Sequence, residues 1–182
     1  MKTPSPTPLE ARDQAVFLAL MWALSRPGEV QKLETGGANG LEAVGLALLD
    51  LETSFYTSDP ALYQTFLRLG ARPEPPDKAA YLFFSPVDEA ALDAIAQAPL
   101  GTLLHPEQAA TLVLAGALGR GPRLRLRGPG IREATLLEAG LLEPFWRLRA
   151  ERISFPLGWD ALVVFSQGEC VGIPRSTLVE VI

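Results

Sequence analysis

A chain of 182 residues is long enough to form one domain with a sizeable hydrophobic core. Its 16 basic and 21 acidic residues give a net charge of −5, which argues against a duplex nucleic acid partner, because that function needs a basic surface. The longest unbroken apolar run has ten residues, 15–24, whereas a helix that spans a bilayer needs about 20. We therefore expect no membrane segment.

One cysteine, Cys170, and one histidine, His105, limit the chemistry further. A single cysteine excludes an intrachain disulfide, and the two residues are too few for a zinc site of Cys and His ligands. No clustered acidic motif indicates a magnesium site, so we expect no metal. The first ten residues, MKTPSPTPLE, lack the apolar stretch of a secretory signal, so we expect a cytoplasmic protein.

Three prolines in residues 1–8 predict a mobile arm, followed by one α/β domain over residues 9–182. Residues 9–25 show a helical period, and the Arg-Pro-Gly sequence at 26–28 ends the helix. We interpret its stripe as core packing, although Leu18 and Trp22 widen it enough for a subunit interface. The residues of the stripe are Val16, Phe17, Leu20, Met21 and Leu24.

Strands and helices then alternate along residues 29–115, which is typical of a layered α/β domain. Asp59 and Pro60 form a good helix start, because Asp caps free amides and proline suits the first helical position; Gly70 ends that helix. The expected strands are 29–33, 54–57, 79–84 and 110–115, and the expected helices are 41–51, 60–69 and 87–98. The glycine-rich stretch 36–40 lacks the full spacing of a phosphate-binding or dinucleotide motif, so we interpret it as a connection.

Residues 120–132, RGPRLRLRGPGIR, hold five arginines and no acid. As a strand, residues 123–127 place arginines on one face, where side chains two residues apart lie roughly 7 Å from each other. Arg125, Arg127 and Arg132 are therefore candidates for contact with a phosphate, a phosphonate or an acidic partner. The alternative is an edge strand whose charges prevent aggregation.

The last quarter of the chain predicts a helix around 143–152 and then a β-hairpin, with strands near 161–165 and 170–173. Apolar residues on both faces of the first strand predict a central position in a mixed sheet covered by helices. Arg175 follows Pro174 at the end of the second strand and is a further candidate contact for an anion. Pairing with an acid such as Asp160 or Glu180 is the alternative.

Several segments together resemble one family, the H subunit of the bacterial carbon–phosphorus lyase core complex. They are LSRPG at 24–28, LLDLET at 48–53, PE at 106–107 leading into ATLVL at 110–114, LRL-x-GPGI at 124–131, FPLG-x-D at 155–160 and IPRSTLVEV at 173–181. The resemblance covers most of the chain. Arg125 falls where the family commonly has arginine, whereas Arg127 falls where a hydroxyl residue is more usual.

The resemblance implies a fold similar to that of the pyridoxal-phosphate-dependent transferases. Pyridoxal chemistry needs a lysine that forms a Schiff base, and none of the three lysines lies in a recognisable cofactor motif, so we expect no cofactor. His105 has no evident catalytic partner in the sequence, and Cys170 is interpreted as a small buried apolar residue. No catalytic residue is predicted.

The resemblance also implies partners: the G, I and J subunits, and a second copy of the chain in a homodimer. That complex takes part in alkylphosphonate catabolism and makes α-D-ribose 1-methylphosphonate 5-triphosphate from ATP and methylphosphonate. The leading hypothesis is an accessory subunit, with helix 9–25 and the aromatic helix at Phe145 and Trp146 as contact surfaces. The alternative is an autonomous enzyme or sensor that binds a phosphorylated or phosphonate molecule through Arg125, Arg127, Arg132 and Arg175.

Overall fold

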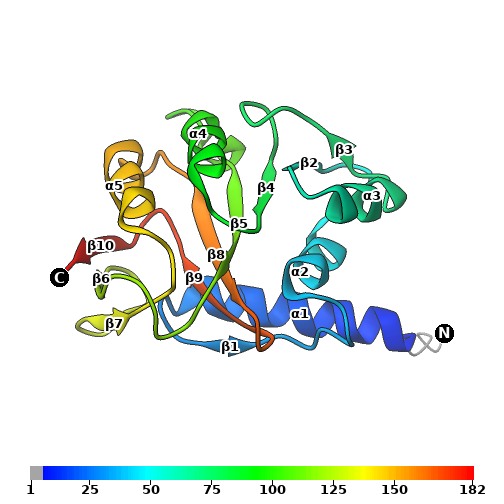
Figure 1. Ribbon diagram of the computed structural model, residues 1–182, viewed down its shortest axis with the longest axis horizontal. Helices are drawn as coiled ribbons and strands as arrows, with labels where there is room; N and C mark the ends of the chain where they lie inside the picture. The colour runs from blue at the N-terminus through cyan, green and yellow to red at the C-terminus, as the bar shows by residue number, and fades with distance from the viewer. Residues whose placement is uncertain (1–5) are drawn as a thin grey trace.

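The computed structural model describes residues 6–182, and its centre is a mixed sheet of seven strands in the order β1-β9-β8-β5-β4-β2-β3 (Figure 1). The five strands from β3 to β8 run parallel, β9 is antiparallel to β8, and β1 is antiparallel to β9. The bounds are β1 (Gln31–Lys32), β2 (Ser54–Thr57), β3 (Arg72–Pro73), β4 (Tyr81–Phe84), β5 (Thr111–Gly116), β8 (Asp160–Phe165) and β9 (Glu169–Ile173). The predicted mixed sheet is confirmed.

Helices cover both faces of this sheet (Figure 1). The helices are α1 (Pro8–Ser25), α2 (Gly40–Leu48), α3 (Pro60–Arg68), α4 (Glu89–Gln97), the short 3-10 helix η1 (Pro106–Gln108) and α5 (Glu143–Arg152). Along β4, Leu82 and Phe84 pack on the side of α4 and α5, while Phe83 packs on the side of α1, α2 and α3. The central strands are apolar at successive positions because both of their faces are buried.

The order of the parallel strands changes direction between β2 and β4. The chain passes from β2 through α3 outward to β3, returns, and then passes from β4 through α4 to β5 on the other side. Right-handed crossovers in opposite directions place α3 and α4 on opposite faces of the sheet. In sheets of this kind, ligands bind beyond the carboxyl ends of the strands at such a switch point.

A second, antiparallel sheet of three strands lies beside α5 and was not expected from the sequence (Figure 1). Its strands are β6 (Leu124–Arg127) in the centre, with β7 (Thr135–Leu137) and β10 (Leu178–Val181) on either side. Leu124 and Leu126 are fully buried, so the arginines of β6 face outward. The chain end thus leaves the main sheet after β9 and pairs with the arginine-rich strand.

The helix starts follow the capping signals of the sequence. Oδ1 of Asp59 accepts hydrogen bonds from the backbone amides of Ala61 and Leu62, which confirms the predicted start of α3. Thr7 and Glu10 form a capping box at the start of α1. Residues 1–5 of the predicted arm lie outside the described part of the chain, whereas Thr7 and Pro8 already belong to the cap and first turn of α1.

The interpretation of the α1 stripe as core is wrong for part of it. Val16 and Leu20 are buried together with Ala23, but Phe17 and Met21 are 45% and 48% exposed. The apolar stripe is wider than the part of the helix surface that the sheet covers, so the residues on its outer side are exposed to solvent. Within residues 6–182, no helix combines the length and the apolar character that crossing a bilayer requires.

Candidate functional site

A cavity of about 710 Å³ lies at the carboxyl edge of the parallel strands. Asp59 follows β2, Ser85 follows β4, Gly116 ends β5 and Phe165 ends β8, and all four line the cavity. The cavity therefore occupies the position at which α/β sheets bind small molecules. Its volume falls within the usual range of such sites, roughly 300–1,000 Å³.

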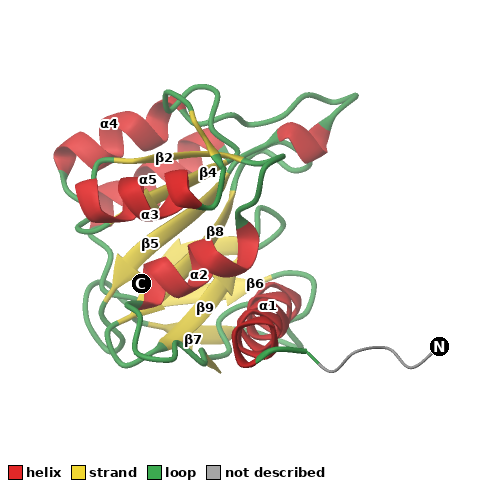
Figure 2. Cartoon of the chain, turned by 90° about the vertical axis from the view of Figure 1, so that its right-hand side faces the viewer, coloured by secondary structure: helices red, strands yellow, loops and turns green. Residues whose placement is uncertain are grey.

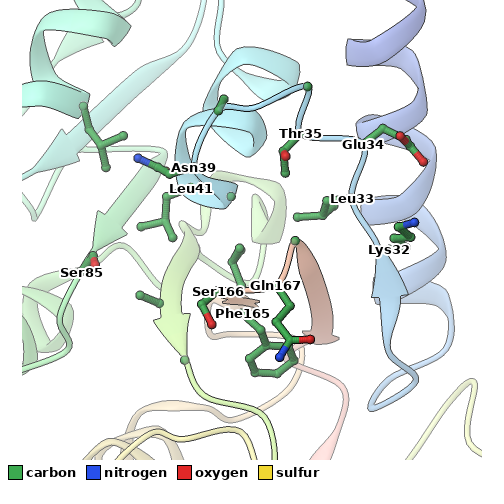
Figure 3. Close-up of a pocket in the computed structure, with 18 of the residues that line it drawn as sticks. Lys32, Leu33, Glu34, Thr35, Asn39, Leu41, Ser85, Phe165, Ser166 and Gln167 are labelled. Carbon is green, nitrogen blue, oxygen red and sulfur yellow. The ribbon is translucent and has the colours of Figure 1, made fainter.

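Two connecting segments complete the wall (Figure 3). Residues 33–40, between β1 and α2, form one side and include Thr35 and Asn39. The turn that joins β8 to β9 lies beside this loop, since the backbone amide of Leu33 donates to the carbonyl of Gly168 at 2.8 Å, and it adds Ser166 and Gln167 to the wall. Because this hydrogen bond and the pairing of β1 with β9 hold the loop and the turn together, Thr35 and Ser166 line the same cavity although they lie 131 residues apart in the sequence (35 against 166).

The cavity wall carries neutral polar groups with unused hydrogen-bonding capacity. They are the hydroxyls of Thr35, Ser85 and Ser166 and the side-chain amides of Asn39 and Gln167. Oδ1 of Asn39 accepts from the backbone amide of Glu42 at 2.8 Å, which caps α2 and leaves the Nδ2 group free. Within residues 6–182, the other four side chains make no hydrogen bond to a protein group.

The charged residues of the wall direct their charge away from the interior. Lys32 and Glu34 are exposed and flank the buried Leu33, whose side chain faces the cavity (Figure 3). The carboxylate of Asp59 accepts from the first-turn amides of α3 at 2.7 and 3.1 Å. A negative charge at a helix N-terminus is stabilised there and is only partly available to a ligand.

Arg175 lies at the other edge of the sheet, where β8 begins. Its Nε and Nη2 donate to the two carboxylate oxygens of Asp160 at 3.2 and 2.7 Å, and its backbone amide donates to the same carboxylate at 2.7 Å. Nη1 donates to the carbonyl of Pro106 at 2.6 Å. The guanidinium therefore joins β8, η1 and the segment after β9. Of the two alternatives given by the sequence, the structure shows the pairing of Arg175 with Asp160.

Arg149 on α5 lies close to this pair and is only 4% exposed. Its Nη2 donates to the carbonyl of Pro174 at 2.8 Å. Burial lowers the pKa of Arg149 to about 10, and the charge of Asp160 opposes that shift. At neutral pH the side chain stays charged, so Asp160 faces two arginines in a partly dry environment.

His105 and Cys170 lie outside the cavity. Nδ1 of His105 is 3.0 Å from Oε1 of Glu107, in an exposed pair formed by the residue just before η1 and a residue within it. Burial raises the pKa of the Cys170 thiol to about 12, which keeps it protonated at physiological pH. Among residues 6–182, no three His, Cys, Asp or Glu side chains are grouped so that they could hold a metal ion.

Comparison with known proteins gives the family. The model of the family described as "Bacterial phosphonate metabolism protein (PhnH)" matches residues 8–180. The chain belongs to the PhnH family. It is also 36% identical over 170 residues to the putative C-P lyase subunit protein HtxG of Stutzerimonas stutzeri, a match that covers 91% of this chain and 85% of the relative.

The remaining candidate arginines of this PhnH-family chain lie around the small sheet and do not meet Arg175. Arg125 pairs with Glu180 of the neighbouring strand at 3.1 Å. Arg127 and Arg132 are exposed, at the end of β6 and in the loop after it. None of the four lines the cavity. Their role in binding an anion or a partner stays a prediction.

Sequence reasoning missed the cavity residues. The stretch 36–40 connects β1 to α2 as expected, but it also lines the cavity through Gly36, Ala38, Asn39 and Gly40, beside Thr35. Gly40 is required there because a side chain at this position would meet Cγ1 of Val164 on β8. The sequence signal for this wall is the Asn-Gly pair that begins a buried helix directly after a glycine-rich loop. It indicates a cavity only when the position of β8 beside it is known.

Proposed function

We propose that this chain is a subunit of a carbon–phosphorus lyase complex acting in alkylphosphonate catabolism. The observation that carries the proposal is the family match over residues 8–180. The name of the relative from Stutzerimonas stutzeri, a putative C-P lyase subunit, supports it independently. In the proposed assembly the partners are the G, I and J subunits, in the cytoplasm, and the complex makes α-D-ribose 1-methylphosphonate 5-triphosphate from ATP and methylphosphonate.

The proposal includes one domain over residues 9–182 and a distant kinship with the pyridoxal-phosphate-dependent transferase fold. The support for one domain is that strands β4, β5 and β8 contribute to the hydrophobic clusters on both faces of the sheet. The support for the kinship is a mixed sheet covered by helices on both faces. The accessory role is supported by the arginines: Arg175 is held by Asp160, and Arg125 is held by Glu180.

A second copy of the chain is the proposed occupant of the outer face of α1. Phe17, Leu18, Met21 and Trp22 are each 45–50% exposed, and their spacing places them on one side of the helix. Figure 2 looks nearly along α1 and shows the sheet and α2 on its inner side. Residues 15–24 of α1 are apolar on every side, and such a helical segment is normally buried all round. A two-fold axis would let one copy of α1 cover the other.

The aromatic helix α5 does not serve as the second contact surface that the sequence suggested. Phe145 is fully buried and Trp146 is 3% exposed, because both rings pack inside the chain's own core. Phe145 contacts the rings of Trp146 and Trp159 with centroids 4.9 and 5.7 Å apart. The proposed homodimer therefore rests on α1 alone.

Charge on the outer face of α1 should abolish the homodimer. We expect the double variant Phe17→Glu, Met21→Glu to elute as a monomer in size-exclusion chromatography with light scattering, while the unmodified chain elutes as a dimer, because the two like charges cannot pair with each other and their burial in the interface is costly. Leu104→Glu is the matched control, since Leu104 is 87% exposed on the loop before η1, outside the proposed interface. A monomeric unmodified chain, or a dimeric double variant, would contradict the proposed interface.

The accessory role has its own test in a turnover assay. The purified chain, incubated with ATP and methylphosphonate, should release no adenine, because an accessory subunit contributes contacts to the assembly and leaves the chemistry to its partners. Adenine release by the purified chain would instead support the competing function of an autonomous enzyme.

A further inference from the structure

The cavity at the carboxyl edge of the sheet has the chemistry of a binding site for a neutral molecule. Five uncharged polar side chains surround it: Thr35, Asn39, Ser85, Ser166 and Gln167. Hydroxyls both donate and accept hydrogen bonds, and side-chain amides offer both functions on separate atoms. A wall of this kind suits a ligand that also donates and accepts at several points, such as one with several hydroxyl groups.

Apolar residues supply the remaining contact area. Leu33, Leu41, Leu62 and Val164 line the cavity between the polar groups, and all four are less than 10% exposed. Small-molecule sites combine a mostly apolar lining with a few polar groups that set orientation. A ligand with one apolar or flat part and one hydroxyl-rich part would use both kinds of surface.

The cavity is not built for a strongly charged anion. Asp59 occupies two of the free amides at the start of α3, and Asn39 occupies one at the start of α2, so those donors are already used. No arginine among residues 6–182 lines its wall, and the lysine that does, Lys32, is exposed. Arg175 binds Asp160 at the opposite end of β8, roughly 16 Å away at about 3.3 Å per residue.

We propose that this cavity binds an uncharged, hydroxyl-rich small molecule of the size of a nucleoside or a disaccharide. The inference does not depend on the proposed function, because every residue of the cavity wall belongs to a single chain. The ligand's hydroxyls bond with Thr35, Ser166 and the free amide of Asn39, while its flat or apolar part packs on Leu41 and Val164.

The test uses the purified full chain and three probes: adenosine, trehalose and ATP. Each probe is added at concentrations up to about 10 mM, and its binding is measured by saturation-transfer NMR and by the rise in melting temperature. We expect adenosine or trehalose to bind and to raise the melting temperature. The probe that binds more tightly shows whether the cavity prefers a nucleoside or a disaccharide. ATP should bind no more tightly than adenosine. Ser166→Trp, which places a large ring at the exposed mouth, should weaken binding at least about tenfold.

Ser154→Trp is the control variant, since Ser154 is exposed near the other end of β8, and it should leave binding unchanged. Three results would overturn the proposal. The first is that neither adenosine nor trehalose binds. The second is that ATP binds about tenfold more tightly than adenosine. The third is that Ser166→Trp does not weaken the binding of the neutral probe. The last result would place the probe elsewhere on the chain. A cooperative melting transition in both variants ensures that a loss of binding is not a loss of folding.

Discussion

Replacing Asp160 with alanine is expected to destabilise the chain by about 3 kcal/mol, because Arg175 loses its ion-pair partner and the buried Arg149 loses the negative charge that it faces. Asp160 accepts three hydrogen bonds from Arg175, and the two side chains are 22% and 16% exposed. Arg149 would keep only the carbonyl of Pro174. Removing one partner of such a group costs more than the pair contributes, since the remaining charge cannot return to water.

Urea denaturation of Asp160→Ala and the unmodified chain measures this difference. Glu180→Ala is the matched control, because it removes the partner of Arg125 from an ion pair whose side chains are 37% and 58% exposed. Exposed pairs of this kind contribute less than about 1 kcal/mol. Equal midpoints for Asp160→Ala and Glu180→Ala would show that Arg175 and Arg149 remain solvated, and the interpretation of Arg175 as a structural clamp would then be wrong.

Gly172→Ala is expected to cost about 2–3 kcal/mol, although it adds only one methyl group. The added Cβ would lie 2.5 Å from both the carbonyl carbon and oxygen of Ala23 and 2.7 Å from the amide nitrogen of Leu24. These are backbone atoms of α1, so no side-chain rotation relieves the contact. The helix must shift away from β9, which disturbs the packing of Val16 and Leu20 against the sheet.

Thermal and urea unfolding of Gly172→Ala give the size of the effect. Gly119→Asn provides the comparison, because nothing lies within 4 Å of an added Cβ there and asparagine tolerates its positive φ of 74°. We expect the Gly119 variant to lose less than about 1 kcal/mol. If the Gly172 variant is as stable as the Gly119 variant, α1 does not pack closely against β9. The position of the outer face of α1, on which the proposed dimer depends, would then be less well defined.

The local elements of the fold were predictable because their signals are local. Asp59 and Pro60 start α3 wherever the rest of the chain lies, and Gly70 ends it with a φ of 83°. Helix 143–152 matches α5 (Glu143–Arg152), and strand 54–57 matches β2 (Ser54–Thr57). Continuous apolar runs correctly indicated that β8 is covered on both faces.

The parts that escaped prediction depend on segments that are far apart in the sequence. The cavity exists only because the loop before α2 and the turn after β8 meet at the sheet edge, and neither carries a recognised motif. The second sheet exists because β10 pairs with β6, which places Glu180 beside Arg125. Likewise, periodicity identified the apolar side of α1 but gave no sign of how much of it the sheet would cover.

The exposed arginines fit the proposed assembly better than a small-molecule site. Arg123, just before β6, and Arg127, at its end, are exposed, whereas Leu124 and Leu126 between them are buried in the core. Arginine is enriched at protein interfaces, where it pairs with acidic groups of the partner. If this face meets a partner subunit, charge reversal at Arg123 and Arg127 should weaken assembly and leave the homodimer through α1 unchanged.

Co-expression of the chain with the G, I and J subunits, followed by affinity purification and mass measurement by light scattering, tests the proposed function most directly. We expect all four polypeptides in one stable particle whose mass includes this chain, and we expect that particle to persist through size-exclusion chromatography. If the other subunits assemble with one another while this chain elutes apart from them at every salt concentration, the assignment to the complex is contradicted.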